Sequence, residues 1–340
     1  MIRIAVDAMG SDEYPVPDIV GAVMAAKEFK VEIFLVGDEK LIKPVLAAQE
    51  PGNLPIRIIH APDMLSMEDK GEKLALKTRH KDSKTSMAVG IRMVKNNEAD
   101  AFVTAGNTGG AWLTSLFNLG RIRGVDRPGL APIFPTATGS CVVIDTGANP
   151  DCKPEHLMQF AILGSTFVNK ARGVINPRVA LLSNGEEGGK GNELVRNTYP
   201  LLAESGLNFI GNVEGKELFG GAADVVVTDG FASNILLKSS EAVAKLITDT
   251  LKEQLKSSPI SMVGAMLAKP AFKHLKAMMD PDDVGAAPLL GINGLVFIGH
   301  GRSNARALVS AVRAARQAVT ANTLQAIHAS IRESISHVHP

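Results

Sequence analysis

The sequence predicts an α/β protein built on a doubly wound, mostly parallel sheet. Short apolar runs alternate with helical stretches along the 340 residues, which is the rhythm of such sheets. The runs at 101–104, 141–144 and 224–227 are continuously apolar or nearly so, as in strands buried on both faces. Each ends in a turn of Gly, Asn, Thr and Asp. We expect these turns to meet at one sheet edge, where such sheets bind ligands.

The elements follow in order from the amino terminus, and we expect one domain over residues 1–340. The last expected helix is rich in alanine, which favours packing in the core over a dedicated dimer helix. Helices are expected at 16–29, 39–48 and 111–118, from 235 onward, and at 303–336. Strands are expected at 2–6, 31–36, 56–59, 101–104, 141–144, 179–182, 207–210, 224–227 and 295–298.

Charge and composition argue against several classes of protein. The 36 Lys and Arg side chains nearly balance 35 Asp and Glu, so no overall field favours nucleic acid. Cys141 and Cys152 have no zinc or C-x-x-C spacing, which indicates a reduced, cytoplasmic protein. No apolar stretch approaches the roughly 18 residues that span a membrane. The chain begins in a strand rather than a signal peptide.

The turn after the strand at 101–104 is a candidate anion site. Gly106, Asn107, Thr108 and Gly109 lead into the helix at 111–118. Amides at a helix N-terminus bind anions where the backbone can approach closely. A plain tight turn explains the same residues equally well. No G-x-G-x-x-G follows the first strand, so a dinucleotide enzyme loses support.

A glycine-rich loop at 184–192 presents one ammonium group. It is not a P-loop, because only three residues separate Gly185 from Gly189 and Gly191 replaces the Ser or Thr that binds magnesium. Lys190 is therefore either a point charge for a bound phosphate or a solvated loop lysine. Asn192 is expected to cap the helix that follows.

Other polar side chains also follow apolar strands. Asp229 and Asn234 come after the strand at 224–227. Asn234 is expected to cap the next helix, and its amide also suits a developing oxyanion. Glu214 follows another strand and has no assigned role. His300 lies between two glycines at a strand end, where it suits acid–base catalysis or donation to a carbonyl, and Ser303 is expected to cap the last helix.

Residues 253–280 break the α/β rhythm with a helical hairpin interrupted by Pro259 and Pro270. Its apolar tip and basic rim fit contact with a membrane surface or an acidic partner protein. Packing on the sheet or on another subunit is the equal alternative. The expected contact residues are Met262, Val263, Met266, Leu267, Lys269, Phe272, Lys273 and Lys276.

Taken together, several segments resemble the bacterial phosphate acyltransferase family, in the family's order and over nearly the whole chain. Departures from the pattern are Ser11 in place of a second Gly, Ser183-Asn184 in place of Asn-Ile, and Ala232-Ser233 in place of Thr-Gly. The matching segments are 4–10, 105–109, 145–149 with 151–157, 185–187 with 190–192, 211–215, 228–231, and 288–294 with 300–301.

The resemblance implies a three-layer αβα fold similar to that of the phosphate acetyltransferases. It implies transfer of a fatty acyl group from acyl carrier protein to inorganic phosphate, giving acyl phosphate for phospholipid synthesis. It also implies a homodimer that needs no metal or cofactor and associates peripherally with the membrane. A candidate partner there is the membrane-bound, acyl-phosphate-dependent glycerol-3-phosphate acyltransferase.

We hypothesise direct attack of bound phosphate on the thioester, because phosphate is already a competent nucleophile. Lys190 and the turn at 106–109 would hold the phosphate, and Asn234, with His300, would stabilise the oxyanion. A covalent route through Cys152 is the less favoured one. Further substrate-binding candidates are Asp145, Asn149, Asn192, Glu214, Asp229, Asn293 and Ser303.

Two other kinds of function stay open. One is a different enzyme on a related fold: another small-acyl phosphotransacylase, or an NAD-dependent decarboxylating dehydrogenase. A dehydrogenase would bind nicotinamide and usually hold a divalent metal, and the sequence has no clear carboxylate cluster for one. The other is a non-enzymatic, membrane-associated binding protein, which would make no acyl phosphate.

Overall fold

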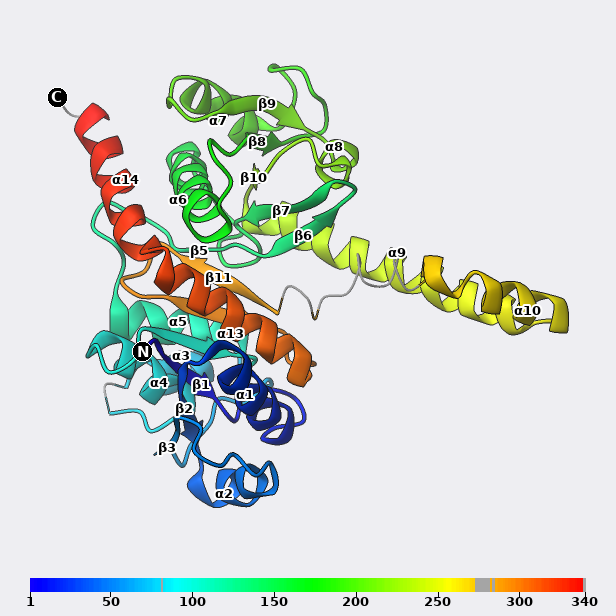
Figure 1. Ribbon diagram of the computed structural model, residues 1–340. Coiled ribbons are helices and arrows are strands. Elements are labelled where there is room, and N and C mark those ends of the chain that lie inside the picture. Colours follow the sequence, from blue (N-terminus) through cyan, green and yellow to red (C-terminus); the bar gives the residue numbers. More distant parts are fainter. Residues whose placement is uncertain (81, 273–281, 283–284, 339–340) are drawn as a thin grey trace.

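The computed structural model describes residues 1–80, 82–272, 282 and 285–338, and their strands form two sheets (Figure 1). The seven-stranded sheet has the order β3-β2-β1-β4-β12-β11-β5, and the five-stranded sheet has the order β6-β7-β10-β8-β9. The strands are β1 Arg3–Asp7, β2 Glu32–Gly37, β3 Ile56–His60, β4 Ala101–Thr104, β5 Gly129–Leu130, β6 Ile133–Thr136, β7 Gly139–Ile144, β8 Val179–Leu182, β9 Phe209–Val213, β10 Val225–Val227, β11 Ala286–Leu290 and β12 Val296–Gly299.

Most neighbouring strands are parallel. In the first sheet β3, β2, β1, β4 and β12 run together, and β11 is antiparallel to both of its neighbours. In the second, β7, β10, β8 and β9 run together and β6 is antiparallel. The helices are α1 Val16–Phe29, α2 Glu39–Ala48, α3 Gly71–Arg79, α4 Ser86–Lys95, α5 Thr108–Leu119, α6 Pro154–Arg172, α7 Glu193–Ala203, α8 Gly215–Gly220, α9 Gly230–Lys256, α10 Pro259–Leu267, α13 Ala305–Thr320 and α14 Thr323–Val338.

Helices cover both faces of the seven-stranded sheet. Successive side chains of a strand point to opposite faces, so Ile4 joins the cluster that holds Ile19 of α1 and Leu308 of α13. Its neighbour Ala5 joins the cluster that holds Ile91 of α4. This double burial explains why these strands read as continuous apolar runs. The predicted α/β class with three αβα layers is confirmed.

The largest hydrophobic cluster contains side chains from both sheets, including Val6 of β1 and Ile144 of β7. The C-terminal helices also connect the two parts, because α13 packs on α1 and α14 packs on α6. The predicted single helix at 303–336 is wrong. It divides at Asn322, whose φ of +50° breaks the helical backbone between α13 and α14.

Two predicted helix caps are each replaced by another residue. The cap of α13 is Asn304, whose side chain accepts the N–H of Ala307, rather than Ser303. The cap of α9 is Asp229 rather than Asn234, so α9 begins five residues before the predicted start at 235. Asn192 does cap α7, as predicted.

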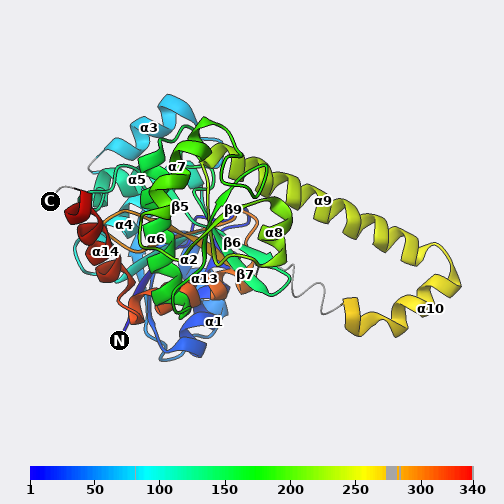
Figure 2. The ribbon, with the colours of Figure 1, turned by 90° about the horizontal axis from the view of Figure 1, so that it is seen from above.

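Helices α9 and α10 leave the body as an arm (Figures 1 and 2). Pro259 starts α10, as its missing N–H allows at a first helical turn. Ile260, Met266 and Leu267 are 86%, 73% and 79% exposed, so for α10 the alternative of packing on the sheets of its own chain is wrong. Lys273 and Lys276 lie outside the described residues. No described helix is both long and apolar enough to cross a bilayer.

Candidate functional site

The turn after β4 presents backbone amides at the start of α5. Asn107 caps the helix, and its Oδ1 accepts the Gly110 N–H at 2.9 Å. The N–H groups of Thr108 and Gly109 have no partner among the described residues, and both residues are exposed. Free amides at the positive end of a helix dipole attract anions. The backbone here is suited to bind phosphate.

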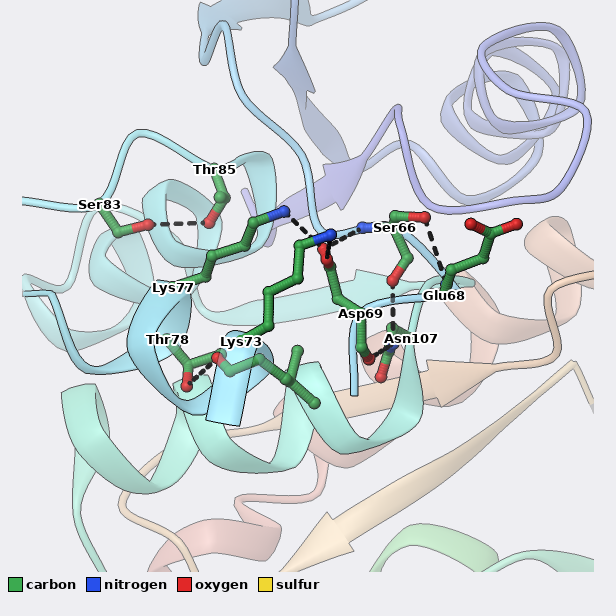
Figure 3. Close-up of polar contacts among 10 residues, drawn as sticks. Ser66, Glu68, Asp69, Lys73, Lys77, Thr78, Ser83, Thr85 and Asn107 are labelled. Atoms are coloured by element: carbon green, nitrogen blue, oxygen red, sulfur yellow. Dashed lines mark hydrogen bonds and ion pairs between the residues drawn. The ribbon is translucent and has the colours of Figure 1, made fainter. Parts of the chain in front are cut away.

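The side chain of Asn107 is itself engaged within the chain (Figure 3). Its Nδ2 donates to the carbonyls of Ser66 and Asp69, each at 3.0 Å. The buried Asp69 carboxylate accepts the ammonium groups of Lys77 and Lys73 at 2.7 and 2.9 Å, which holds the pKa of Asp69 well below its usual range. Asn107 therefore fixes a basic segment beside the start of α5.

A buried carboxylate joins the β1 and β4 turns. Asp7 Oδ2 accepts the Thr104 hydroxyl at 2.8 Å, and Thr104 Oγ1 in turn accepts the Gly106 N–H at 2.9 Å. Burial raises the pKa of Asp7. A Cβ at Gly10 would lie 2.9 Å from the Gly106 nitrogen, so the two turns can approach this closely only with glycine.

The turn after β7 is also organised by a buried carboxylate. Asp145 accepts the N–H groups of Leu130 and Asn149, at 2.8 and 2.5 Å. Burial raises the pKa of Asp145 to about 6. Asn149 is buried as well, and its Nδ2 donates to the Pro128 carbonyl at 2.8 Å. Both of these predicted substrate-binding side chains hold the turn together.

The turn after β10 leaves one amide side chain free. Asp229 caps α9 by accepting the Ala232 N–H at 2.7 Å, so this predicted substrate-binding side chain is occupied. Asn234 lies one turn further along the helix and is exposed, and its side chain has no hydrogen-bond partner among the described residues. A Cβ placed on Gly147 of the β7 turn would be 3.7 Å from the Asn234 Cγ. The free amide thus faces the neighbouring turn.

The loop after β8 borders a small cavity. Lys190 is exposed and forms no salt bridge with a described residue, whereas Asn192 is occupied as the α7 cap. The cavity measures about 310 Å³. Ser183, Asn184 and Ala232 line it. The other polar lining residues are Asn192, Thr228 and Asp229.

Helix α9 also meets the turn after β12. Arg302 Nη2 lies 3.7 Å from Glu241 Oε1 of α9. Burial, Arg302 and Lys238 lower the pKa of His300, so its ring is neutral at neutral pH. Lys238 follows Asn234 by four residues, which places the two on the same side of α9. His300 and Asn234 therefore lie along the same stretch of this helix.

Contacts connect these turns in a ring between the two sheets. The β1 turn touches the β12 turn, where the Asp12 N–H donates to the Gly301 carbonyl at 2.7 Å. On the other side, the Pro128 carbonyl accepts Asn149 Nδ2 and also Trp112 Nε1 of α5, at 2.8 and 3.4 Å. The ring thus returns to the helix that the β4 turn opens. The turns converge from two sheets, not from one sheet edge as expected.

Three predicted residues lie outside the ring or are hidden. Asn293, a predicted substrate-binding residue, lies at the opposite end of β12 from the ring, where its Nδ2 donates to the Arg121 carbonyl at 2.8 Å. Glu214 precedes α8, and its N–H donates to Glu217. Ser303 is buried behind Gly299.

The two cysteines are poorly suited to nucleophilic catalysis. Burial raises the pKa of the Cys141 and Cys152 thiols, each to about 12, so both stay protonated at neutral pH. Cys141 is also inside β7.

Asp7 and the Asp69–Lys73–Lys77 group are not among the residues predicted from the sequence. Asp69, Lys73 and Lys77 recur every four residues, the spacing of one helix face, and this signal was available in the sequence. Asp7 is the last residue of β1 and Asp145 directly follows β7, so position at a strand end was the signal there.

Solved structures with this architecture include phosphotransacetylases. EutD phosphotransacetylase from Staphylococcus aureus matches with a TM-score of 0.57 and 17% identity, covering 93% of this chain and 94% of that chain. A 4-hydroxythreonine-4-phosphate dehydrogenase from Klebsiella pneumoniae matches with a TM-score of 0.54 and 13% identity, covering 94% and 100%. At such identities the likeness shows the fold alone. The molecule is therefore of the phosphotransacetylase fold class, which dehydrogenases share.

Sequence comparison defines the family. The chain belongs to the family described as "Fatty acid synthesis protein", whose model matches residues 2–326. It is 46% identical over 333 residues to the phosphate acyltransferase of Elusimicrobium minutum, covering 98% of this chain and 96% of the relative. It is 45% identical over 327 residues to that of Acidobacterium capsulatum, covering 96% of each. The predicted membership of the phosphate acyltransferase family is confirmed.

Proposed function

We propose that the protein transfers a fatty acyl group from the thioester of acyl carrier protein to inorganic phosphate. The observation that carries this proposal is the nearly full-length similarity to proteins named phosphate acyltransferase, at 45–46% identity. The free groups of the ring support it. Amides and an ammonium group suit a phosphate, and a free carboxamide suits the oxygen of a thioester.

The reaction needs positioning more than strong acid or base. A phosphate oxygen attacks the carbonyl carbon, a C–O bond forms, and the carbonyl oxygen becomes an oxyanion. The C–S bond then breaks and the thiolate leaves with the bonding pair. Because a thiol has a pKa of about 8.5, this leaving group requires no strong acid. Preorganised donors around the oxyanion and the phosphate supply the catalysis.

The free and occupied side chains take different roles in this proposal. Lys190 and the amides of Thr108 and Gly109 hold phosphate, and Asn234 donates to the oxyanion. Neutral His300 is a further donor to the carbonyl oxygen. The occupied side chains, including Asp145, position the turns without touching substrate. The raised thiol pKa of Cys152 favours direct attack by phosphate over an acyl-enzyme.

Production of acyl phosphate tests the function directly. The protein is incubated with inorganic phosphate and acyl carrier protein or coenzyme A thioesters, and acyl phosphate is trapped as a hydroxamate. We expect product from the carrier-protein thioester. Lys190→Ala should raise the KM for phosphate about tenfold or more, the loss expected for one charge-assisted contact. Absence of acyl phosphate from every thioester would contradict the proposal.

We further infer that the arm makes the contact with a membrane surface. Its tip exposes Ile260, Met266 and Leu267, with Lys269 alongside, and an apolar tip with a basic rim suits the headgroup region of a bilayer. Flotation with anionic liposomes tests this, with Leu267→Glu/Phe272→Glu expected to stay in the dense fraction. Unchanged flotation of that variant would exclude α10 as the lipid contact.

The proposal also includes a homodimer that works at the cytoplasmic membrane surface and hands acyl phosphate to a membrane-bound glycerol-3-phosphate acyltransferase. Large exposed apolar surface on a soluble chain calls for a partner surface, which supports association of this kind. Sedimentation equilibrium of the protein without lipid tests the dimer. A monomer at micromolar concentration would contradict it.

A further inference from the structure

A second cavity lies beside the ring and has no role in the mechanism above. It measures about 740 Å³ and is formed by the middle of α5, the connection at 121–128 and the start of α6. Its lining combines the apolar side chains of Trp112 and Leu116 with basic ones, Arg127 and Lys153 among them. A mixed lining of this kind suits a ligand with both aliphatic and anionic parts.

The cations of this cavity are available for an anion. Arg127 and Lys153 are exposed, and neither forms a salt bridge within the described part of the chain. Of the carboxylates in the lining, Asp126 accepts Gln159 Nε2 at 3.0 Å and so has a partner elsewhere, while Glu155 is exposed. Arg121 donates to the Asp126 carbonyl.

His156 adds a neutral donor. Its Nδ1 accepts the Lys153 N–H at 3.1 Å, which leaves the proton of the neutral ring on Nε2. Burial is the largest cause lowering the pKa of His156, so the ring is neutral at neutral pH. The cavity therefore offers a hydrogen-bond donor as well as two cations.

Lysine at position 153 is unfavourable for the stability of helix α6. It is the N-cap of the 19-residue helix α6, and its side chain makes no capping hydrogen bond. N-caps favour Ser, Thr, Asp and Asn, and a cation is unfavourable at the positive end of a helix dipole. An anion bound in front of the helix would reverse that penalty.

The cavity is next to the site of reaction. Trp112 Nε1 and Asn149 Nδ2 donate to the same carbonyl, that of Pro128, so one residue separates the cavity from the β7 turn. Lys153 follows Asn149 by four residues, and Trp112 follows Thr108 by four. A ligand in the cavity with a flexible arm would thus reach the ring.

We propose that this cavity binds the phosphodiester and the adjoining aliphatic part of the phosphopantetheine arm that carries the acyl thioester. Arg127 and Lys153 contact the phosphate oxygens, His156 donates to a polar group of the arm, and Trp112 with Leu116 packs against its methyl groups. The arm then extends past Pro128 to place the thioester beside Asn234. This inference rests on the proposed function, and it adds where the donor is held.

Three acyl donors separate this role from the alternatives. They are acyl carrier protein, acyl-phosphopantetheine, and acyl-N-acetylcysteamine, which has the thioester but no phosphate. For Arg127→Ala and Lys153→Ser we expect kcat/KM to fall about tenfold or more with the first two donors and to stay within twofold with the third. The KM for inorganic phosphate should not change. Lys153→Ser should keep or raise the melting temperature, because serine is a good N-cap.

Lys27→Ser, at an exposed position on α1, is the matched control and should leave all of these constants unchanged. Loss confined to acyl carrier protein would show that the cavity contacts the carrier's acidic surface, and would overturn the proposal. An equal loss of kcat/KM with all three donors, together with a raised KM for phosphate, would show that the cavity binds inorganic phosphate. This outcome would also overturn the proposal. No loss with any donor would also overturn it. If the proposed function is wrong, the wild-type protein will form no acyl phosphate with any donor. That result differs from all of those above, and it would overturn this inference as well.

Discussion

The ring of turns and the α9–α10 arm differ in which side chains they bury and which they expose. In the ring, polar groups such as Asp145 are fully buried and hydrogen-bonded, so that the few free groups are held in place. In the arm, apolar groups such as Ile260 are 86% exposed. The ring thus holds its free groups in fixed positions, as preorganised catalysis requires. The described part of the arm presents apolar surface that no described residue of the chain covers.

Removing a turn-holding carboxylate should have the largest effect. Asp145→Ala is expected to lower the free energy of unfolding by about 3 to 5 kcal/mol, because the buried N–H groups of Leu130 and Asn149 lose their acceptor. Urea denaturation measures this. Asp151→Ala, at an exposed neighbouring position, should change it by less than about 0.5 kcal/mol. Equal stability of the two variants would contradict the role given to Asp145.

Removing a free side chain of the ring should affect activity alone. Asn234→Ala is expected to lower kcat about 10²- to 10³-fold, the usual loss for one oxyanion donor, with little change in unfolding free energy. Steady-state kinetics and urea denaturation check both parts. Asn53→Ala, another exposed asparagine, is the control. A stability loss that accounts for the lost activity would show that Asn234 holds structure instead.

Burial of carboxylates near the ring should appear in the pH dependence of stability. Burial raises the pKa of Asp18 to about 7. The folded chain then binds more protons than the unfolded one between about pH 4 and 7, so its unfolding free energy falls as pH rises through that window. Asp18→Asn should remove about 2 to 3 kcal/mol of the fall between pH 5 and 8. Asp249→Asn, on the exposed arm, should leave this fall unchanged. If the unfolding free energy of wild type and of Asp18→Asn depends on pH with the same slope, the role given to Asp18 is refuted.

The smallest effect on stability is expected in the arm. Leu267→Glu should change the free energy of unfolding by less than about 0.5 kcal/mol, because the side chain is 79% exposed and loses no packing in the chain. Thermal unfolding without lipid is the measurement. A large drop in melting temperature would mean that the arm packs against a second copy of the chain.

Much of the fold could be predicted because its main strands carry a strong local signal. β4, β7 and β10 are buried on both faces and so are apolar throughout, apart from their ends. β11 was missed because Ala286, Ala287 and Pro288 have low strand propensity, and pairing with β12 and β5 fixes it. The division into two sheets was also missed, since strand order depends on contacts between distant segments.

The sequence predicted the location of the turns that form the candidate site better than it predicted the role of each side chain. Strand ends marked the right turns, but whether a polar side chain is free depends on partners far along the chain. The Asn107 side chain donates hydrogen bonds to the carbonyls of Ser66 and Asp69, which lie 41 and 38 residues away in the sequence. Asp229 and Asn234 are both good N-caps, and only the structure shows that Asp229 is the one that caps α9 and leaves the Asn234 amide free.

Intact-mass spectrometry of the protein after mixing with acyl carrier protein thioester in the absence of phosphate tests direct transfer most sharply. We expect an unchanged mass for the chain, with acyl phosphate formed only once inorganic phosphate is added. A chain heavier by one acyl group, with the adduct on Cys152, would contradict it.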